Sequence, residues 1–167
     1  MNEASKWLQK NIEFIRENGT VLDLACGGGR HSRFLIYKGF SVVAADINVA
    51  AITQEKLQNT KILQADLEAD PWPFDAAQFD GIIVVNYLWR PQFDDIKASL
   101  KSGGVVIFDT FMVGNEEFGR PSNPKFLLNS GELKDVFADM EILAFEEGYI
   151  DDPSPAMRQS IVARKRT

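Results

Sequence analysis

Thr20-Val-Leu-Asp-Leu-Ala-Cys-Gly-Gly-Gly-Arg-His-Ser32 is the stretch that decides the fold of this chain. It begins as a short apolar run that ends in Asp23, Leu24 and Ala25, a pattern typical of a buried strand. Three consecutive glycines follow, and a helix-compatible pattern resumes from Arg30 to Tyr37. A strand that ends in glycines and opens a helix brings bare backbone amides, and the positive end of the helix dipole, up to a ligand. The stretch therefore predicts a cofactor-binding loop.

The composition is that of a soluble globular protein. The chain has 167 residues, of which 45% are hydrophobic and 25% charged, and we expect a single domain over residues 1–167 with a substantial core. The net charge is −6 and the pI about 4.8. Because this field repels phosphate backbones and anionic membranes, we expect neither a nucleic acid nor a membrane as partner.

Cysteine usage and the apolar runs indicate a cytoplasmic protein. The single cysteine, Cys26, cannot form an internal disulfide, which fits a reducing compartment. No basic region followed by an apolar stretch opens the chain, so no signal peptide is expected. No apolar run approaches the roughly 20 residues that a membrane helix needs.

Strand and helix patterns alternate along most of the chain. Strands are expected over 20–25, 41–46, 61–66, 79–86 and 105–109, and helices over 4–17, 30–37, 51–57, 91–100 and 129–137. Within these, Asn48 is expected to cap the third helix, and Glu132 to complete a capping box with Asn129. Residues 1–18 thus form an N-terminal helical lead, and residues 110–129 are irregular and could form a substrate lid.

Two last strand patterns, over 140–147 and 157–165, have no helix between them and should pair as an antiparallel hairpin. The expected fold class is α/β: a doubly wound, Rossmann-like, seven-stranded sheet, mostly parallel, with one antiparallel strand from this C-terminal hairpin. A ligand is then expected at the carboxyl ends of the strands.

Acidic residues at three strand ends indicate which cofactor the glycines serve. The nicotinamide fingerprint would require glycine at positions 27, 29 and 32, and position 32 is Ser. A pyrophosphate gains nothing from Asp23, whereas a cofactor with a cationic sulfur and an ammonium group does. Asp46 follows Gly29 by about 17 residues, where a carboxylate accepts hydrogen bonds from both ribose hydroxyls. Asp66, at the next strand end, could accept from an adenine amino group.

Four segments together resemble the successive motifs of class I S-adenosylmethionine-dependent methyltransferases. They are Val21-Leu-Asp-Leu-Ala-Cys-Gly-Gly-Gly, Val43-Ala-Ala-Asp46, Gln64-Ala-Asp66 and Phe79-Asp-Gly-Ile-Ile. The resemblance covers about residues 20–110, and the final hairpin is also a feature of that family. The segment from Phe118 to Leu133 further resembles the small tellurite-resistance and thiopurine-methyltransferase-like group. One departure is Ala25, where the family often has glycine; alanine is small enough for binding to survive.

The resemblance implies S-adenosylmethionine as cofactor, no metal, and a set of binding residues. Asp23, Ala25 and Gly27 would surround the methionine part, Asp46 would bind the ribose, and Asn86 would lie beside the sulfonium. The complete expected set is Asp23, Ala25, Cys26, Gly27, Gly29, Asp46, Ile47, Asp66, Leu67 and Asn86.

The acceptor side is expected beyond the fourth strand and in the irregular segment. Arg90 and Arg120, beside Tyr87 and other aromatic residues, would suit a small anionic or flat acceptor. Surface arginines paired with nearby glutamates are an equally good reading of both. An Asn-Pro-Pro-aromatic tetrad resembling the amino methyltransferases of DNA bases is absent, because residues 86–89 are Asn-Tyr-Leu-Trp.

The sequence names no catalytic residue. Cys26 lies inside the cofactor loop and is better explained by packing than by nucleophilic chemistry, and His31 by a cap or packing role. A soft sulfur, selenium or tellurium acceptor, or an oxyanion, would need no general base, because the sulfonium is already activated and the enzyme mainly aligns and desolvates. The alternatives are a regulatory protein that binds S-adenosylmethionine without turnover, and a nicotinamide-dependent oxidoreductase. Neither the acceptor nor the oligomeric state follows from the sequence.

Overall fold

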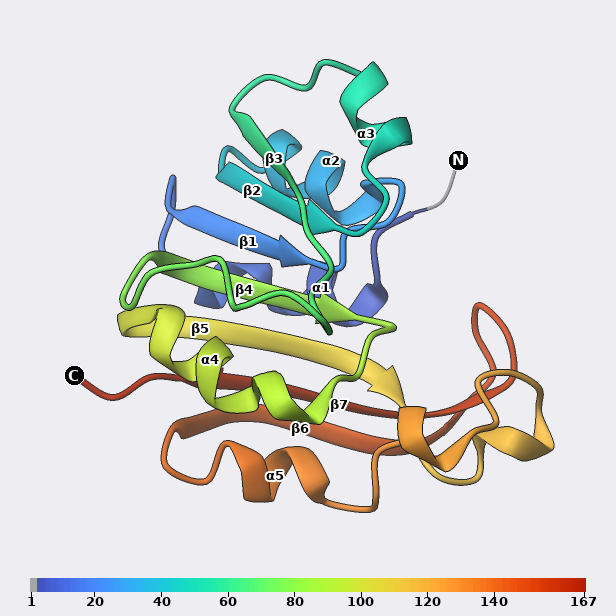
Figure 1. The fold of residues 1–167 in the computed structure, drawn as a ribbon. Coiled ribbons are helices and arrows are strands. Elements are labelled where there is room, and N and C mark those ends of the chain that lie inside the picture. The colour runs from blue at the N-terminus through green and yellow to red at the C-terminus, as the bar shows by residue number, and fades with distance from the viewer. Residues whose placement is uncertain (1–2) are drawn as a thin grey trace.

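The computed structural model describes residues 3–167 and arranges them as a seven-stranded sheet with helices on both faces (Figure 1). The strand order is β3-β2-β1-β4-β5-β7-β6. The strands are β1 Thr20–Leu24, β2 Ser41–Asp46, β3 Thr60–Gln64, β4 Phe79–Val85, β5 Leu100–Phe111, β6 Glu141–Ile150 and β7 Ala156–Arg164. The helices are α1 Lys6–Asn11, α2 Arg30–Tyr37, α3 Ala50–Gln54, α4 Phe93–Ser99 and α5 Glu132–Val136, with 3₁₀ turns at Ile12–Phe14, Arg90–Gln92, Asn115–Glu117 and Pro124–Phe126.

The first five strands are parallel, and β7 alone runs antiparallel to its neighbours, β5 and β6. This confirms the predicted fold class. Strands β6 and β7 pair as an antiparallel hairpin because no crossover helix separates them, and β7 lies between β5 and β6.

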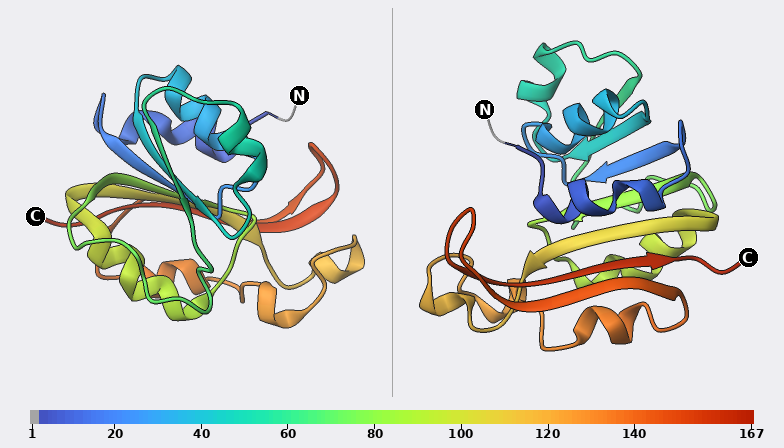
Figure 2. Two further views of the ribbon diagram at one scale, coloured as in Figure 1. Left: turned by 45° about the horizontal axis from the view of Figure 1, so that its top comes forward. Right: turned by 180° about the vertical axis from the view of Figure 1, so that it is seen from behind.

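The core has two layers, one on each face of the sheet. One layer packs α1, α2 and α3 against the sheet through Leu8, Leu35 and Ile52, all fully buried. The other packs α4 and α5 through Ile96, Leu133 and Phe137 (Figure 2). Every residue of β4 is buried, as expected for a central strand covered on both faces.

The strand order reverses between β1 and β4, which lie side by side. In open α/β sheets a crevice forms at this point, outside the carboxyl ends of the strands, because the chain leaves the two strands toward opposite faces. The glycine stretch follows β1 directly and therefore lies at the edge of the crevice.

Several element boundaries differ from the sequence expectation. The predicted N-terminal helical segment, 1–18, includes residues 1–2, which lie outside the described residues. The helix in the rest of the segment is shorter than expected. It is a short α1 capped by the Ser5 hydroxyl and followed by a 3₁₀ turn. Strand β5 begins at Leu100 rather than at residue 105, because Leu100 pairs with Phe79 across an irregularity in the ladder.

The segment 110–129 is more ordered than its sequence suggests. Two 3₁₀ turns occupy it, and Met112 forms an isolated bridge with Leu128. Asn115 is buried: its side-chain amide donates to the carbonyl of Pro121 and its oxygen accepts from the amide of Met157. These bonds fasten the segment to β7. Among the described residues, none of the helices is long and apolar enough to cross a lipid bilayer.

Candidate functional site

The loop after β1 has a backbone that only small residues tolerate. Ala25, Gly27 and Gly29 have φ of 56°, 53° and 88°, in the left-handed region. A Cβ on Gly29 would lie 2.7 Å from Cδ1 of Ile52 in α3, so glycine there allows the loop to pack on that helix. A Cβ on Gly27 or Gly28 would meet no atom within 4 Å, so the space over this part of the loop is open.

Asp46, at the end of β2, fixes the loop to the neighbouring strand. One carboxylate oxygen accepts from the amide of Gly27 at 2.9 Å, and the other accepts from the amide of Asn48 at 3.0 Å. An ionised carboxylate offers about four acceptor positions, so roughly two remain for a ligand. Ile47 follows it, and this apolar side chain is 60% exposed. Together they present acceptor oxygens beside an apolar surface.

Asp23 is in a different environment. It is 2% exposed, and its carboxylate accepts a hydrogen bond of 2.6 Å from the hydroxyl of Ser32. Burial raises the pKa of Asp23 to about 6, and the bond to Ser32 opposes this only in part. Asp23 is therefore close to its titration point near neutral pH.

The third acid, Asp66, caps a turn. Its Oδ1 accepts from the amides of Glu68 and Ala69 at 3.0 and 3.1 Å. Leu67 beside it is 8% exposed, and its carbonyl accepts from the side-chain amide of Gln92. The capping role that acids often have at strand ends is thus present here, and Oδ2 is left for other partners.

Cys26 and His31 are both neutral and inward-facing. Burial raises the pKa of the Cys26 thiol to about 12, so the thiol is protonated near neutral pH. His31 is 6% exposed, its Nε2 accepts from the amide of Ser5 at 3.1 Å, and burial lowers its pKa to about 4. His31 therefore holds the N-terminal segment against α2 as a neutral acceptor.

A network of polar side chains lies where β4 and β5 end. Asn86 has φ of 56°, and its Oδ1 accepts from Nη2 of Arg158 at 2.7 Å. Arg158 also donates from Nε to Oδ1 of Asp109 at 3.0 Å. Asp109 accepts further bonds from the hydroxyls of Ser5 and Ser160, at 2.7 and 2.8 Å. The network ties the chain's N-terminal segment to β5 and β7 at the carboxyl edge of the sheet.

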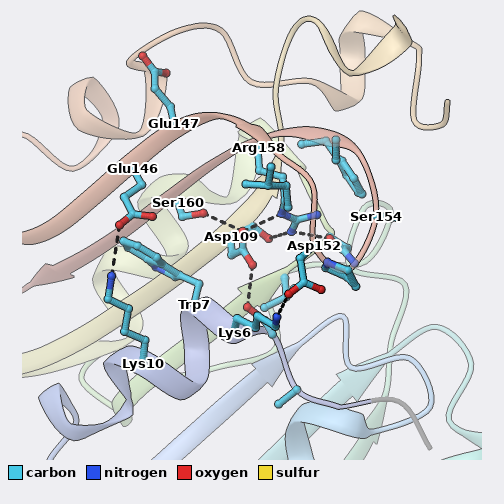
Figure 3. A pocket seen from close by; sticks show the side chains of 18 of the residues that line it. Lys6, Trp7, Lys10, Asp109, Glu146, Glu147, Asp152, Ser154, Arg158 and Ser160 are labelled. Carbon is cyan, nitrogen blue, oxygen red and sulfur yellow. Dashed lines mark hydrogen bonds and ion pairs between the residues drawn. The ribbon is translucent and has the colours of Figure 1, made fainter. Parts of the chain in front are cut away.

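A cavity of about 790 Å³ opens over this network, between α1 and the β6–β7 hairpin (Figure 3). Its aromatic walls include Trp7, Phe111 and Tyr149, and Arg30 and Arg158 line it as cations. Two ion pairs, Lys6–Asp152 and Lys10–Glu146, connect α1 with the hairpin region across the cavity. Its size is that of a pocket for a small organic molecule.

None of the residues expected on the acceptor side, Tyr87, Arg90 and Arg120, lines this cavity. Tyr87 lines a second, smaller cavity of about 230 Å³, where its hydroxyl is buried and has no hydrogen-bond partner among the described residues. Arg90 lines neither cavity, because its guanidinium binds both oxygens of Glu132 and the carbonyls of Lys125 and Leu127. Arg120 is exposed in the 110–129 segment and also lines neither of these cavities.

Arg158, Asp109 and Arg30 were not singled out from the sequence. Asp109 could have been predicted from the sequence, because it is a fourth acid at the end of an apolar strand, like Asp23, Asp46 and Asp66. Arg158 could not have been predicted, since it lies in the last strand and reaches the site only because β7 pairs with β5.

Comparisons with known proteins show the family to which the chain belongs. The family described as "Methyltransferase domain" matches residues 21–104, half of the chain. A curated relative, "Putative methyltransferase YqeM" of Bacillus subtilis, is 31% identical over 122 residues; the match covers 65% of this chain and 47% of that protein. The chain thus spans about half the length of this relative.

Solved structures share the fold. The crystal structure of TehB from Haemophilus influenzae matches with a TM-score of 0.75 and 22% identity, over 96% of this chain and 61% of that chain. A 1,6-didemethyltoxoflavin-N1-methyltransferase from Burkholderia thailandensis, solved with 1,6-didemethyltoxoflavin and S-adenosylhomocysteine, matches with a TM-score of 0.69 and 17% identity. That match covers 96% of this chain and 75% of that chain.

Proposed function

Because this chain belongs to the class I S-adenosylmethionine-dependent methyltransferases, we propose that it transfers the methyl group of S-adenosylmethionine to a small-molecule acceptor. The observation that carries the proposal is a juxtaposition. A glycine loop with open space above it lies on one side of the β1/β4 crevice, and an aromatic-walled cavity reaches Asn86 on the other.

The donor site is proposed at the residues expected from the sequence. Asp46, with about two unused acceptor positions, would bind the ribose hydroxyls, and Ile47 would cover one face of the adenine. Asp66 and Leu67 would lie at the adenine edge. Asp23, Ala25, Cys26, Gly27 and Gly29 would form the cradle for the methionine part, and Asn86 would lie next to the sulfur.

These residues fit a cationic donor. The open space over Gly27 and Gly28 admits a ligand to the main chain, and Asp23 and Asp46 supply negative charge beside it. When bound, S-adenosylmethionine supplies an activated methyl group on a sulfonium. The protein then has to align the acceptor and exclude water, and such positioning can contribute several kcal/mol to the reduction of the barrier.

The acceptor is proposed to be a small molecule whose reacting atom already carries an available lone pair. Two groups near the crevice are poorly suited to proton abstraction: Cys26 is a neutral thiol, and the Asp109 carboxylate already accepts from Ser5, Ser160 and Arg158. A soft sulfur, selenium or tellurium centre, or an oxyanion, needs no base. The didemethyltoxoflavin enzyme, which has this fold, is a precedent for a small-molecule acceptor.

Ligand binding and turnover test the proposal separately. In a thermal-shift experiment S-adenosylhomocysteine should raise the melting temperature and NAD should not; stabilisation by NAD alone would contradict the proposal. Turnover is then measured with methyl-labelled S-adenosylmethionine over thiols, selenite, tellurite, small carboxylates and small amines. Binding without turnover of any acceptor would favour the regulatory alternative.

A further inference from the structure

We propose that the acceptor bound between α1 and the β6–β7 hairpin carries one carboxylate, which Arg30 and Arg158 bind, and a flat apolar body, which packs against the aromatic walls of the cavity. The inference rests on the proposed function, since it names the class of acceptor for that reaction. It assigns acceptor binding to Arg30 and Arg158, which line the cavity, in place of Arg90 and Arg120, which do not.

Arg158 presents unused donors to the cavity. Its Nε and Nη2 bind Asp109 and Asn86, whereas Nη1 makes no hydrogen bond to any residue of the described part of the chain. The side chain is 13% exposed, and its guanidinium stacks on Phe111 with Cζ 4.5 Å from the ring centroid. A guanidinium held on three sides is rigid, and its Nη1 is left as the donor for a carboxylate oxygen.

Arg30 provides the charge that the carboxylate would neutralise. It begins α2, directly after Gly29, and its Nη1 donates to the carbonyl of Glu3 at 2.7 Å. Among residues 3–167 no carboxylate forms an ion pair with it. Burial lowers the pKa of Arg30, and the nearby Arg158 lowers it further. Two cations that approach each other in a partly desolvated site stabilise an anion placed between them.

Most of the other charges of the cavity are compensated, whereas Glu3 lines it with an exposed carboxylate that forms no ion pair among residues 3–167. Lys6 pairs with Asp152 and Lys10 with Glu146, while Asp109 offsets Arg158. Glu147 points away from the other labelled side chains and binds Ser130, Gly131 and Gln159 (Figure 3). Arg30 lines the cavity without an ion pair to any residue of 3–167, although the nearby Asp109 and Asp23 act to raise its pKa. The cavity is lined by five acids and four cations, so a single negative charge on the ligand is favoured over two.

The walls indicate the rest of the ligand. Phe111, Trp7, Tyr149 and Pro153 offer flat apolar surfaces, and the volume of about 790 Å³ exceeds what a carboxylate alone would fill. Flat rings stack on such surfaces and on guanidinium planes. Asn86 lines the same cavity, so a ligand there would reach the proposed donor site.

Benzoate and benzamide, which have nearly the same shape and differ in charge, test the inference on the unmodified protein. Binding is followed by NMR through the indole N–H signals, because Trp7 lines the cavity and Trp72 and Trp89 do not. Benzoate should bind at least about tenfold more tightly than benzamide and should move the Trp7 signal selectively. Equal affinities, or shifts confined to Trp72 and Trp89, would overturn the inference.

Arginine variants assign the effect to the two side chains. Arg30→Gln and Arg158→Gln should each reduce the preference for benzoate at least about tenfold, with benzamide binding unchanged. Arg16→Gln removes the same charge from an exposed position outside the cavity and should leave the preference intact. If Arg30→Gln, which gives up a single hydrogen bond to Glu3, retains the full preference in folded protein, the inference is wrong.

Binding of S-adenosylhomocysteine in the same samples separates the two proposals. If it binds and benzoate is not preferred, the acceptor class is wrong and the proposed methyl transfer stands. If it does not bind, the proposed function fails, whatever the result for benzoate.

Discussion

At the scale of single residues, the two acids beside the glycine loop, Asp46 and Asp23, differ in exposure and in hydrogen bonding. Asp46 is partly exposed and bonds only to backbone amides, which leaves acceptor positions toward the crevice. Asp23 is buried on Ser32 and has a raised pKa. Asp46 is therefore placed to accept from ligand hydroxyls, and we propose that Asp23 contributes only through its charge.

Replacement of Asp46 by alanine should weaken binding of S-adenosylhomocysteine at least about tenfold. The variant loses charge-assisted hydrogen bonds to the ribose, each worth about 1.5–3 kcal/mol. Isothermal calorimetry measures the dissociation constant, with the exposed Asp75→Ala as control. An unchanged constant in Asp46→Ala would remove the β2 acid from the donor site.

The Asp23→Asn variant should change how stability depends on pH. A carboxyl whose pKa is about 6 in the folded protein and 3.8 otherwise binds more protons when folded, so its contribution is fully present below about pH 4 and is lost as pH rises through 6. The lost contribution is on the order of 3 kcal/mol. Urea unfolding at several pH values should therefore show wild-type stability falling relative to Asp23→Asn between pH 4 and 7. If the difference in unfolding free energy between the two proteins does not change with pH, burial does not raise the pKa of Asp23. Asp75→Asn, at an exposed position, is the control.

At the scale of elements, the glycine loop and α1 are each fixed by contacts with distant strands or helices. The loop packs through Gly29 on Ile52 of α3, while Gly28 faces open space. Helix α1 is held at its first turn by Ser5, whose hydroxyl accepts from the amide of Leu8 and donates to Asp109. The glycine loop borders the proposed donor site, and α1 lines the cavity proposed for the acceptor.

Alanine substitutions at adjacent glycines should separate stability from ligand binding. Gly29→Ala places a Cβ against Ile52 at positive φ and should cost at least about 1–2 kcal/mol of unfolding free energy. Gly28→Ala should change stability by less than about 0.5 kcal/mol, yet weaken S-adenosylhomocysteine binding, because the methyl group enters the space proposed for the donor. Denaturant unfolding and calorimetry measure the two effects. Full affinity in Gly28→Ala would place the donor elsewhere.

Removal of the Ser5 hydroxyl should destabilise the protein by about 1–2 kcal/mol, because it deletes both a helix cap and a hydrogen bond to a buried carboxylate. Urea unfolding of Ser5→Ala, compared with Ser102→Ala at an exposed position of β5, gives the difference. If the two variants are equally stable, the Ser5–Asp109 bond does not hold α1 in place.

At the scale of the whole molecule, charge and topology act together. The net charge of −6 opposes polyanionic partners, while the insertion of β7 concentrates two arginines in one cavity. Positive charge in the cavity is therefore local to the two arginines, because acidic residues balance the other cations that line it.

We therefore expect no saturable binding of duplex DNA or single-stranded RNA at about 0.15 M salt. Fluorescence anisotropy with labelled oligonucleotides measures this. Saturable binding that weakens steeply with added salt would show that a local basic surface overrides the acidic total.

The sequence by itself determined the sheet and the loop at its centre. Alternating strand and helix patterns, the glycines after Asp23 and the absence of a helix before the last strand are local signals, because apolar periodicity and backbone freedom depend on near neighbours. The family was indicated by the resemblance of four sequence motifs to those of class I S-adenosylmethionine-dependent methyltransferases. The roles of Asp46, Asp66 and Asn86 toward a ligand stay predictions.

Only the tertiary structure decided which charges meet. The sequence is equally consistent with an acceptor-binding Arg90 and with one paired to a nearby glutamate; in the structure Glu132, 42 residues further along, binds it through both oxygens. Arg158 reaches Asp109 across 49 residues, and Ser5 reaches the same carboxylate across 104. A charged side chain's partner is set by which strands lie side by side, and the placement of β7 next to β5 brings Arg158, rather than Arg90, to the cavity beside the glycine loop.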